Sequence, residues 1–318
     1  MYGKAYTLKT GSFASSDGVN KISYYIFIPY KTPSAILQIS HGMCEHIMRY
    51  EQFADFLCEC GVIVCGNDHL GHGNTAPDDD TLGYTAKSGG ADFMVADLHK
   101  LTELIRGEYP DLPHILLGHS MGSFLAREYL ARYKDSTDAA IISGTAGPEN
   151  PTWAGKLAAR LNMCFCGEKN RSKFINNLAF GGYAKRYPAD APEYFWLSRD
   201  EDIRRAYAND KFCTFAFTAA AYYDLFDVLG RVSKRSWAKK LKKDTPILMI
   251  SGDMDPVGNY GKGVMKIYRR LRDAELKDVT LRLYPDGHHE MLNEINRYDV
   301  FYDILSWLKY HGFVKDIY

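Results

Sequence analysis

The most informative stretch of the sequence is 118-GHSMG-122, in which Ser120 lies between two glycines. It follows the apolar run 114-HILL-117 and precedes a helix pattern over 121–133. A sharp turn from a buried strand into a helix strains the residue at the turn, and only small residues fit on either side. A serine held there can act as a nucleophile if a base removes its proton. On this stretch alone, a serine that merely caps the helix remains an alternative.

A nucleophilic serine needs a histidine as its base and a carboxylate that orients the histidine. Two later predicted strands end in residues of these types: Asp253 and Asp255 in 251-SGDMDPVGN-259, and His288 and His289 in 284-YPDGHHEML-292. Sheets of alternating strands and helices are known to carry these partners in the chain order serine, acid, histidine, with each residue after a different strand. The residues alone leave the choice within each pair open. In each pair, the residue without a catalytic role would belong to the loop: the aspartate would form an Asx turn, and the histidine would be exposed.

The same chemistry needs two backbone N–H groups that bind the negative oxygen of a tetrahedral intermediate. The residue after the nucleophile, Met121, offers one of them. The loop 40-SHGMCEH-46 follows an early strand and offers the other through the N–H of Met43. We therefore expect these two amides to form an oxyanion hole.

The elements that must position these residues alternate between strands and helices. After an antiparallel entry at 5–12 and 21–28, the pattern predicts strands at 34–40, 61–68, 114–118, 138–144, 246–253 and 278–285. Between and after them it predicts helices at 48–60, 89–108, 121–133, 260–272 and 297–310. Near-continuous apolar strands that alternate with helices are typical of an α/β fold, a mostly parallel doubly wound sheet covered on both faces.

The alternation stops at 146-AGPENPTW-153, and no buried strand is predicted from there to about residue 240. We therefore predict a core of residues 1–146 and 241–318, interrupted by a mainly helical cap at 147–240. Such sheets place their sites at the carboxyl ends of the strands, so we expect the cap above that edge. The cap is rich in aromatic residues, which either pack it onto the sheet or line an apolar acyl-chain tunnel.

One cap segment has apolar residues at every fourth position: Trp153, Leu157, Leu161 and Phe165. Lys156 and Arg160 lie beside this stripe. The spacing predicts an amphipathic helix whose apolar side faces either the core or a lipid interface.

Composition excludes several classes of protein. Lysine plus arginine and aspartate plus glutamate are balanced at 39 each, which does not produce the positive field that nucleic-acid binding needs. Seven cysteines, an odd number without CxxC spacing, predict reduced core or half-buried thiols and a reducing compartment. With no signal-peptide pattern and no run long enough to span a bilayer, the expected location is the cytoplasm. The oligomeric state stays open.

Two histidine-rich loops raise the question of a metal site, through His41, His46, Asp68, His69 and His72. Neither an HxHxDH nor an HExxH pattern is present, so we expect no metal. His46 and the segment 68–72 are instead expected to hydrogen-bond each other and to hold the oxyanion loop. The glycine stretches 71–76 and 258–263 lack the residues of a nucleotide-binding loop, so no cofactor is expected.

The chain resembles the monoglyceride lipase and lysophospholipase group of α/β-hydrolases, also described as serine aminopeptidase-like hydrolases. The resemblance rests on 41-HGMCEH-46, 67-NDHLGHG-73, 118-GHSMG-122, 197-LSRDEDIRRAYAND-210, 252-GDMDPV-257 and 287-GHHEML-292. It implies that the acid is Asp255, three residues after the glycine that ends its strand. It also implies that the base is His289, in a G-x-H-E arrangement. Outside the LSR segment the cap matches no family pattern, which leaves the substrate open.

These observations predict a serine hydrolase that cleaves carboxylic esters, with Ser120, His289 and Asp255 as a catalytic triad. The resemblance and the aromatic cap favour monoacylglycerol or lysophospholipid esters as substrates. Short-chain or phenolic esters are an alternative. An aminopeptidase is another, and it would need a cluster of carboxylates to hold a free amine: Asp190, Glu193, Asp200, Glu201 and Asp202. A hydrolase-fold protein that binds a ligand without turnover is the non-enzymatic alternative.

Overall fold

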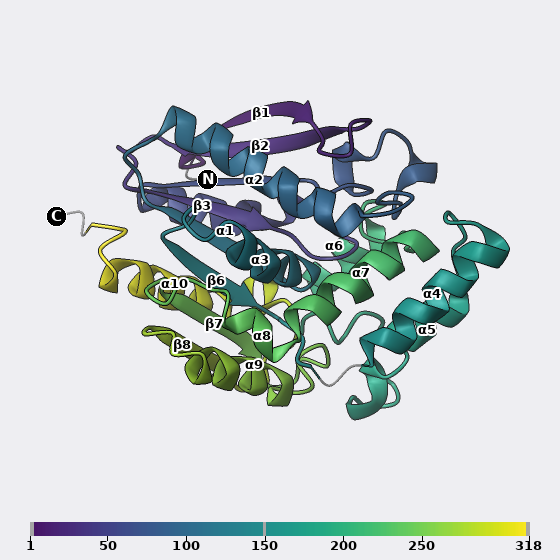
Figure 1. Cartoon of the computed structure of the whole chain (residues 1–318). Coiled ribbons are helices and arrows are strands. Elements are labelled where there is room, and N and C mark those ends of the chain that lie inside the picture. Colours follow the sequence, from purple (N-terminus) through teal and green to yellow (C-terminus); the bar gives the residue numbers. More distant parts are fainter. Residues whose placement is uncertain (1–2, 149–150, 316–318) are drawn as a thin grey trace.

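An eight-stranded sheet forms the centre of the molecule in the computed structural model, which describes residues 3–148 and 151–315. Its strands lie in the order β1-β2-β4-β3-β5-β6-β7-β8 (Figure 1). The pairs β1–β2 and β2–β4 are antiparallel, and all other neighbours are parallel. The predicted antiparallel entry and parallel sheet are confirmed. The strands are β1 (Tyr6–Ala14), β2 (Lys21–Pro29), β3 (Ala35–Ser40), β4 (Val62–Asn67), β5 (His114–His119), β6 (Ala139–Ser143), β7 (Ile247–Gly252) and β8 (Val279–Tyr284).

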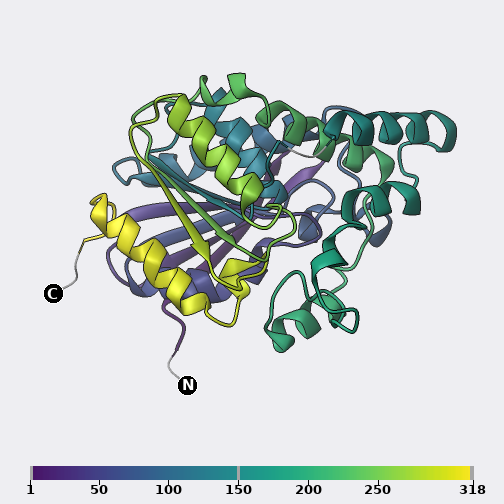
Figure 2. The ribbon, with the colours of Figure 1, turned by 90° about the horizontal axis from the view of Figure 1, so that it is seen from below.

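Helices cover both faces of the sheet (Figures 1 and 2). Side chains alternate between the faces along each strand: in β5, Ile115 and Leu117 pack towards one face and Leu116 towards the other. The first face is covered by α1 (Glu51–Glu59) and α10 (Arg297–Tyr310). The other is covered by α2 (Gly90–Glu108), α3 (Met121–Arg132) and α9 (Lys262–Asp273). Short 3-10 turns occur at η1 (Ile47–Tyr50), η2 (Gly73–Thr75), η3 (Asp79–Thr81), η4 (Tyr183–Arg186) and η5 (Met291–Asn293).

The segment between β6 and β7 contains no strand among its described residues, in agreement with the sequence pattern. Its helices are α4 (Thr152–Cys166), α5 (Lys173–Phe180), α6 (Glu201–Asn209), α7 (Ala219–Val232) and α8 (Arg235–Ala238). α4 lies along α7, which in turn lies against α3 and α2. Small residues allow this approach, since a Cβ atom on Gly155 of α4 would lie 2.7 Å from the Phe226 ring of α7. The last helices of the insertion therefore rest on the core.

Arg127 of α3 joins both ends of this insertion to the core. Its guanidinium donates to the carbonyl oxygen of Ala146, where the insertion begins, at 3.1 Å, and to that of Val232, at the end of α7, at 2.6 Å. It also donates to the Thr145 hydroxyl and lies over the Trp237 ring. Arg127 is completely buried, so these bonds replace the water that its charge has lost.

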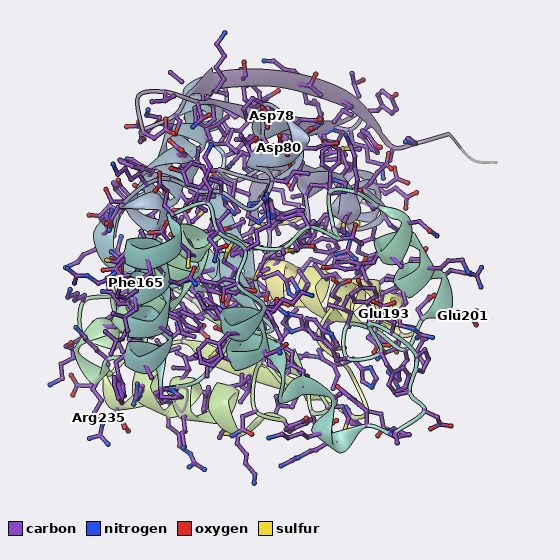
Figure 3. The ribbon with its side chains drawn as sticks, turned by 90° about the vertical axis from the view of Figure 1, so that its right-hand side faces the viewer. Asp78, Asp80, Phe165, Glu193, Glu201 and Arg235 are labelled. Carbon is purple, nitrogen blue, oxygen red and sulfur yellow. The ribbon has the colours of Figure 1, made fainter. Side chains whose placement is uncertain are left out.

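The apolar stripe of α4 faces outward. Trp153 is 72% exposed and Phe165 is 84% exposed, while Leu157 and Leu161 are each about half exposed. The core-facing orientation is therefore wrong, because the small residues Gly155 and Ala159 occupy the inner side of the helix. Figure 3 shows Phe165 on the outside of the cap. Among the described residues, no helix combines the length and apolar character needed to cross a bilayer.

All seven cysteines are free thiols. Cys44, Cys58, Cys65 and Cys213 are buried and Cys60 is partly buried, as the sequence predicted for most of them. Cys164 and Cys166 are exposed, contrary to that prediction. They lie in the last turn of α4.

Candidate active site

Ser120 lies at a strained turn between β5 and α3. Its backbone has φ +52° and ψ −122°, a conformation that residues with a side chain rarely adopt. Its N–H donates to the Ser143 carbonyl oxygen of β6 at 3.0 Å, which fixes the turn to the sheet. The flanking glycines are required by close packing: a Cβ atom on Gly122 would lie 2.0 Å from the Ser40 carbonyl oxygen, and one on Gly118 would lie 2.5 Å from the Gly122 carbonyl oxygen.

His289 and Asp255 meet at the carboxyl ends of β8 and β7. The Nδ1 atom of His289 lies 3.0 Å from Oδ1 of Asp255, although the N–H is not aligned for a full hydrogen bond. The carboxylate is completely buried and also accepts the Val257 N–H at 2.9 Å and the Ser251 hydroxyl at 3.3 Å. These bonds hold the Asp255 carboxylate in place beside the imidazole.

The other member of each pair lies elsewhere. Asp253 is exposed, as expected of an unused loop carboxylate. His288 is not an exposed loop residue, contrary to the prediction, because it is 4% exposed and its ring packs against Phe195 and Tyr187 of the cap. Its Nδ1 atom lies 2.5 Å from the Phe195 carbonyl oxygen. His288 thus fastens the cap to the loop that carries His289.

Two neighbouring histidines have opposite pKa shifts. Burial on its own would lower the pKa of His289, but the carboxylates of Asp255 and Glu290 outweigh it and raise that pKa above its usual 6.5. Burial and, to a smaller extent, the neighbouring His289 lower the pKa of His119 to about 3. The two rings lie 4.7 Å apart between centroids. His119 therefore stays neutral beside an imidazole that can take up a proton. No sequence pattern indicated this role of His119, although it lies next to Ser120 in the glycine-flanked motif.

The loop after β3 runs directly beside Ser120. A Cβ atom on Gly42 would lie 3.0 Å from the Ser120 Cβ atom, which shows how closely the two segments approach. Within the described residues, the N–H groups of Met43 and Met121 donate to no backbone or side-chain acceptor. Both residues line the same pocket as Ser120. The two amides are thus available to an oxygen atom bound there, as an oxyanion hole requires.

A buried charge cluster connects this loop to the His289 loop. Arg49 makes a two-pronged contact with Glu290, with both N–O distances at 2.7 Å, and also contacts Glu45 at 3.0 Å. Glu45 accepts the Gly42 N–H and, at 2.9 Å, the Tyr50 hydroxyl. Burial would raise the pKa of Glu290, but the Arg49 guanidinium lowers it below the usual value. No motif in the sequence indicated these roles. The four-residue spacing of Glu45 and Arg49 was the available signal.

The cap segment around 197-LSR-199 holds the histidine loop by its backbone. The N–H groups of His289 and Glu290 donate to the carbonyl oxygens of Trp196 and Leu197, at 3.2 and 2.8 Å. The Trp196 and His289 rings lie 5.3 Å apart between centroids. Trp196 therefore covers the imidazole from the cap side, a role that its sequence pattern did not reveal.

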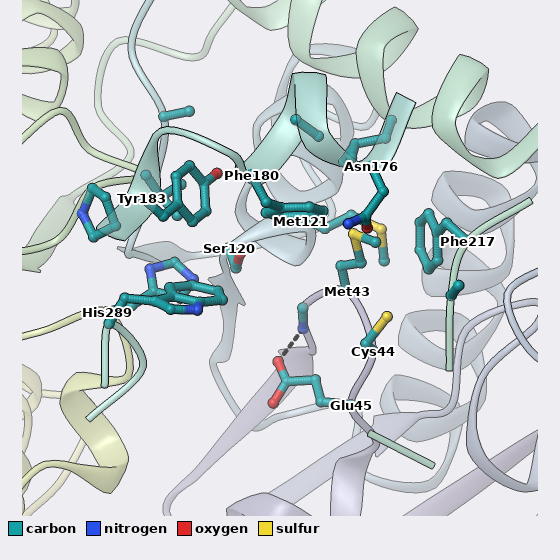
Figure 4. Close-up of a pocket in the computed structure, with 18 of the residues that line it drawn as sticks. Met43, Cys44, Glu45, Ser120, Met121, Asn176, Phe180, Tyr183, Phe217 and His289 are labelled. Carbon is teal, nitrogen blue, oxygen red and sulfur yellow. Dashed lines mark hydrogen bonds between the residues drawn. The ribbon is translucent and has the colours of Figure 1, made fainter. Parts of the chain in front are cut away.

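A cavity of about 700 Å³ lies above Ser120, between the sheet and the cap. Figure 4 shows Ser120, His289 and Met121 around it, with Tyr183 and Phe180 of the cap opposite. Aromatic cap residues line this cavity in addition to packing the cap onto the core: Phe180, Tyr183, Trp196, Phe215, Phe217 and Phe226. Of the two alternatives for the aromatic residues, packing and lining a cavity, both therefore occur. Trp153, Phe165 and Phe174 lie outside it on the surface.

Residues of the histidine-rich loops hydrogen-bond to other parts of the protein. The N–H of His69 donates to Nε2 of His41 at 2.9 Å, and burial lowers the pKa of His69 to about 3. Asp68 accepts the Ile47 N–H at 3.0 Å, so this segment holds the end of the loop that carries Met43. The expected side-chain bond from His46 to this segment is wrong, because the His46 ring turns to Asp210 of the cap at 2.8 Å.

The chain is similar in sequence and fold to known proteins. Residues 31–296 match the sequence profile of the family described as serine aminopeptidase, S33. A monoacylglycerol lipase of Mycolicibacterium smegmatis is 28% identical over 300 residues, which cover 94% of this chain and 96% of that protein. Human monoglyceride lipase is 27% identical over 308 residues, 91% and 88% of the two chains. The crystal structure of a thermostable carboxyl esterase from Bacillus coagulans in complex with glycerol superposes with a TM-score of 0.89 at 30% identity, over 95% and 98% of the chains.

Proposed function

Because the chain belongs to the serine aminopeptidase S33 family of α/β-hydrolases, we propose that it hydrolyses carboxylic esters through Ser120, His289 and Asp255. One observation carries this assignment: the strained Ser120 and His289 line the same cavity, and Asp255 lies beside the His289 imidazole. No metal or cofactor is required for the reaction.

In the proposed mechanism His289 takes the Ser120 proton as the hydroxyl oxygen attacks the ester carbonyl carbon. Asp255 holds the imidazole in the tautomer that accepts at Nε2 and stabilises the cation that forms. The N–H groups of Met43 and Met121 bind the negative oxygen of the tetrahedral intermediate. His289 then protonates the leaving alcohol, and a water molecule repeats the sequence to release the acid and restore Ser120.

We propose monoacylglycerols as the main substrates. Two relatives of nearly full-length coverage carry the names monoacylglycerol lipase and monoglyceride lipase. The cavity has the two kinds of wall that such a molecule needs. Phe180, Leu225 and Phe226 offer apolar surface for an acyl chain, while Glu45 and Tyr207 offer polar groups elsewhere in the same space. Lysophospholipids and short-chain esters are the nearest rivals.

The aminopeptidase alternative receives no support from the carboxylates that it would need. Glu201 and Asp202 pair with Arg205 on the surface of α6, and Asp200 pairs with Arg297. Figure 3 shows Glu193 and Glu201 at the outer edge of the cap. None of the five predicted carboxylates lines the cavity around Ser120.

We further propose that the exposed stripe of α4 contacts lipid surfaces. An interface helix buries its apolar residues among acyl chains, and the outward-facing Trp153, Leu157, Leu161 and Phe165 form such a surface. Since the substrate itself partitions into lipid, this contact would bring the cap to the place where substrate accumulates. For the location of the protein we propose the cytoplasm, since seven free thiols suit a reducing compartment.

The direct test compares the wild type with the Ser120→Ala variant on monoacylglycerols and p-nitrophenyl esters of increasing acyl length. We expect the substitution to lower kcat by about four to six orders of magnitude and to abolish labelling by a fluorophosphonate. Unchanged turnover by the variant would exclude the mechanism. Ligand binding without any wild-type turnover would favour the non-enzymatic alternative.

A further inference from the structure

Three potential metal ligands from separate parts of the chain converge beside the active site. They are a ring nitrogen of His46, a carboxylate oxygen of Asp210 and Sγ of Cys213, and all three atoms lie within 4.8 Å of one another. His46 ends the loop that carries Met43, whereas Asp210 and Cys213 belong to the turn after α6 in the cap. In residues 3–148 and 151–315 no other group of three such side chains converges in this way. The proposed ester hydrolysis uses none of the three.

We propose that His46, Asp210 and Cys213 form a binding site for a zinc ion. Imidazole nitrogen, carboxylate oxygen and thiolate sulfur are the three ligand types that zinc takes in proteins. Magnesium and calcium prefer sites made of oxygen alone, so the thiol selects against them. Three protein ligands leave one tetrahedral position for a water molecule.

The local structure holds the three groups together without help from a metal. The Cys213 N–H donates to the Asp210 carbonyl oxygen at 2.9 Å, which closes the turn that brings their side chains together. The Phe212 N–H donates to Oδ1 of Asp210 at 2.8 Å and leaves Oδ2 to face His46, 2.8 Å away. The His46 ring also packs on the Phe212 ring. Little conformational entropy therefore remains to be lost when an ion binds.

Carboxylates and one guanidinium surround the Cys213 thiol. After burial, the Arg49 guanidinium acts most strongly on the Cys213 thiol, and the carboxylates of Asp210, Glu45 and Glu290 act in the opposite direction. Burial raises the pKa of Cys213, so without a metal the sulfur stays protonated. Binding of the ion then replaces the S–H proton by an S–Zn bond and releases that proton to solvent.

An ion at this place would join the cap to the oxyanion loop. His46 follows Met43 by three residues, and Cys213 lines the substrate cavity. Zinc would hold the turn 210–213 against the loop and oppose any movement of the cap away from it. We therefore expect zinc to stabilise the fold and to slow turnover of substrates that require the cap to open. This site does not depend on the proposed catalytic residues.

Metal binding can be measured on the full-length chain with both exposed thiols removed, as the double variant Cys164→Ser/Cys166→Ser. In this reference protein we expect one Zn²⁺ per chain by titration calorimetry and a rise in Tm on adding Zn²⁺. With Co²⁺ we expect the near-ultraviolet absorption band of a cobalt–thiolate bond. Adding Cys213→Ser should remove the band and weaken Zn²⁺ binding at least about tenfold. Asp210→Asn and His46→Gln should each weaken Zn²⁺ binding by a similar factor. Adding Cys44→Ser, a buried thiol outside the ligand set, should leave both signals unchanged.

Two results would overturn the proposal. One is the absence of saturable Zn²⁺ or Co²⁺ binding by the folded reference protein. The other is binding that survives Cys213→Ser unchanged, which would show that the thiol is not a ligand. The Ser120→Ala variant separates this proposal from the catalytic one, because it should bind zinc as tightly as the reference protein whether or not the wild type hydrolyses esters.

Discussion

The His289 Nδ1 atom lies 3.0 Å from the Asp255 Oδ1 atom, although the two residues follow different strands and are 34 positions apart in the sequence. β7 and β8 are parallel neighbours, so the loops that leave their carboxyl ends start side by side. Asp255 is fully buried, which keeps its negative charge from being screened by water and lets it act strongly on the imidazole.

The pH dependence of turnover should report this contact. His289 acts as a base only when neutral, so kcat/KM should fall as the pH drops through its pKa. Because Asp255 and Glu290 raise that pKa, the midpoint should lie above 6.5, the value expected for an isolated histidine. Asp255→Asn should move the midpoint to lower pH and reduce kcat about 10⁴-fold. A wild-type midpoint at or below 6.5 would contradict the raised pKa.

Gly122→Ala should destabilise the fold. The new Cβ atom would meet the Ser40 carbonyl oxygen at 2.0 Å, and neither the start of α3 nor the end of β3 can shift without disturbing the sheet. We expect a loss of about 1–3 kcal/mol in the free energy of unfolding, measured by urea denaturation. Gly107→Ala is the matched control, because Gly107 lies in α2 with open space around it and should gain up to about 1 kcal/mol. Equal effects of the two substitutions would argue against the close contact.

Arg127→Met should loosen the attachment of the cap. It removes the donors to the Ala146 and Val232 carbonyl oxygens, and these buried acceptors would then lack partners. The free energy of unfolding should fall by about 2–4 kcal/mol, as measured by chemical denaturation. Arg132→Met, on the same helix, removes a partly exposed arginine paired with Asp92 and Glu128 and should cost at most about 1 kcal/mol. A loss at Arg127 no larger than that at Arg132 would show that the buried bonds contribute little.

Phe165→Ser should weaken binding to lipid vesicles while leaving hydrolysis of a water-soluble ester unchanged. Phe165 is 84% exposed on α4, so the fold does not depend on its ring. Loss of one buried phenyl group at an interface corresponds to about 1.5–3 kcal/mol, which is about tenfold or more in vesicle affinity by co-sedimentation. Tyr310→Ser is the control, since Tyr310 is 82% exposed on α10, away from the cap. Equal losses for both variants would mean that α4 is not the contact surface.

Much of the fold and the candidate site could be read from the sequence because each depends on local pattern. Apolar runs that alternate with amphipathic helices predicted the parallel strands and the helices around them within a few residues. Gly118 and Gly122 mark the turn at Ser120 in the sequence, because other backbone atoms lie too close to these two positions for a side chain to fit. Family resemblance was needed to choose Asp255 over Asp253 and His289 over His288, because the two members of each pair are the same residue type.

No local sequence pattern predicted the contacts between segments that are far apart in the chain. The direction of the α4 stripe was set by which side of the helix carried glycine and alanine against α7. Arg49 gained its role from Glu290, 241 residues away, and His46 turned from the nearby Asp68 loop to Asp210 in the cap. The sequence by itself determined the sheet and the order of serine, acid and base, because periodicity and chain order are local properties. Only the tertiary structure decided which charged and polar groups share a buried space, because those pairings depend on how separate elements pack and on which groups lose their water together.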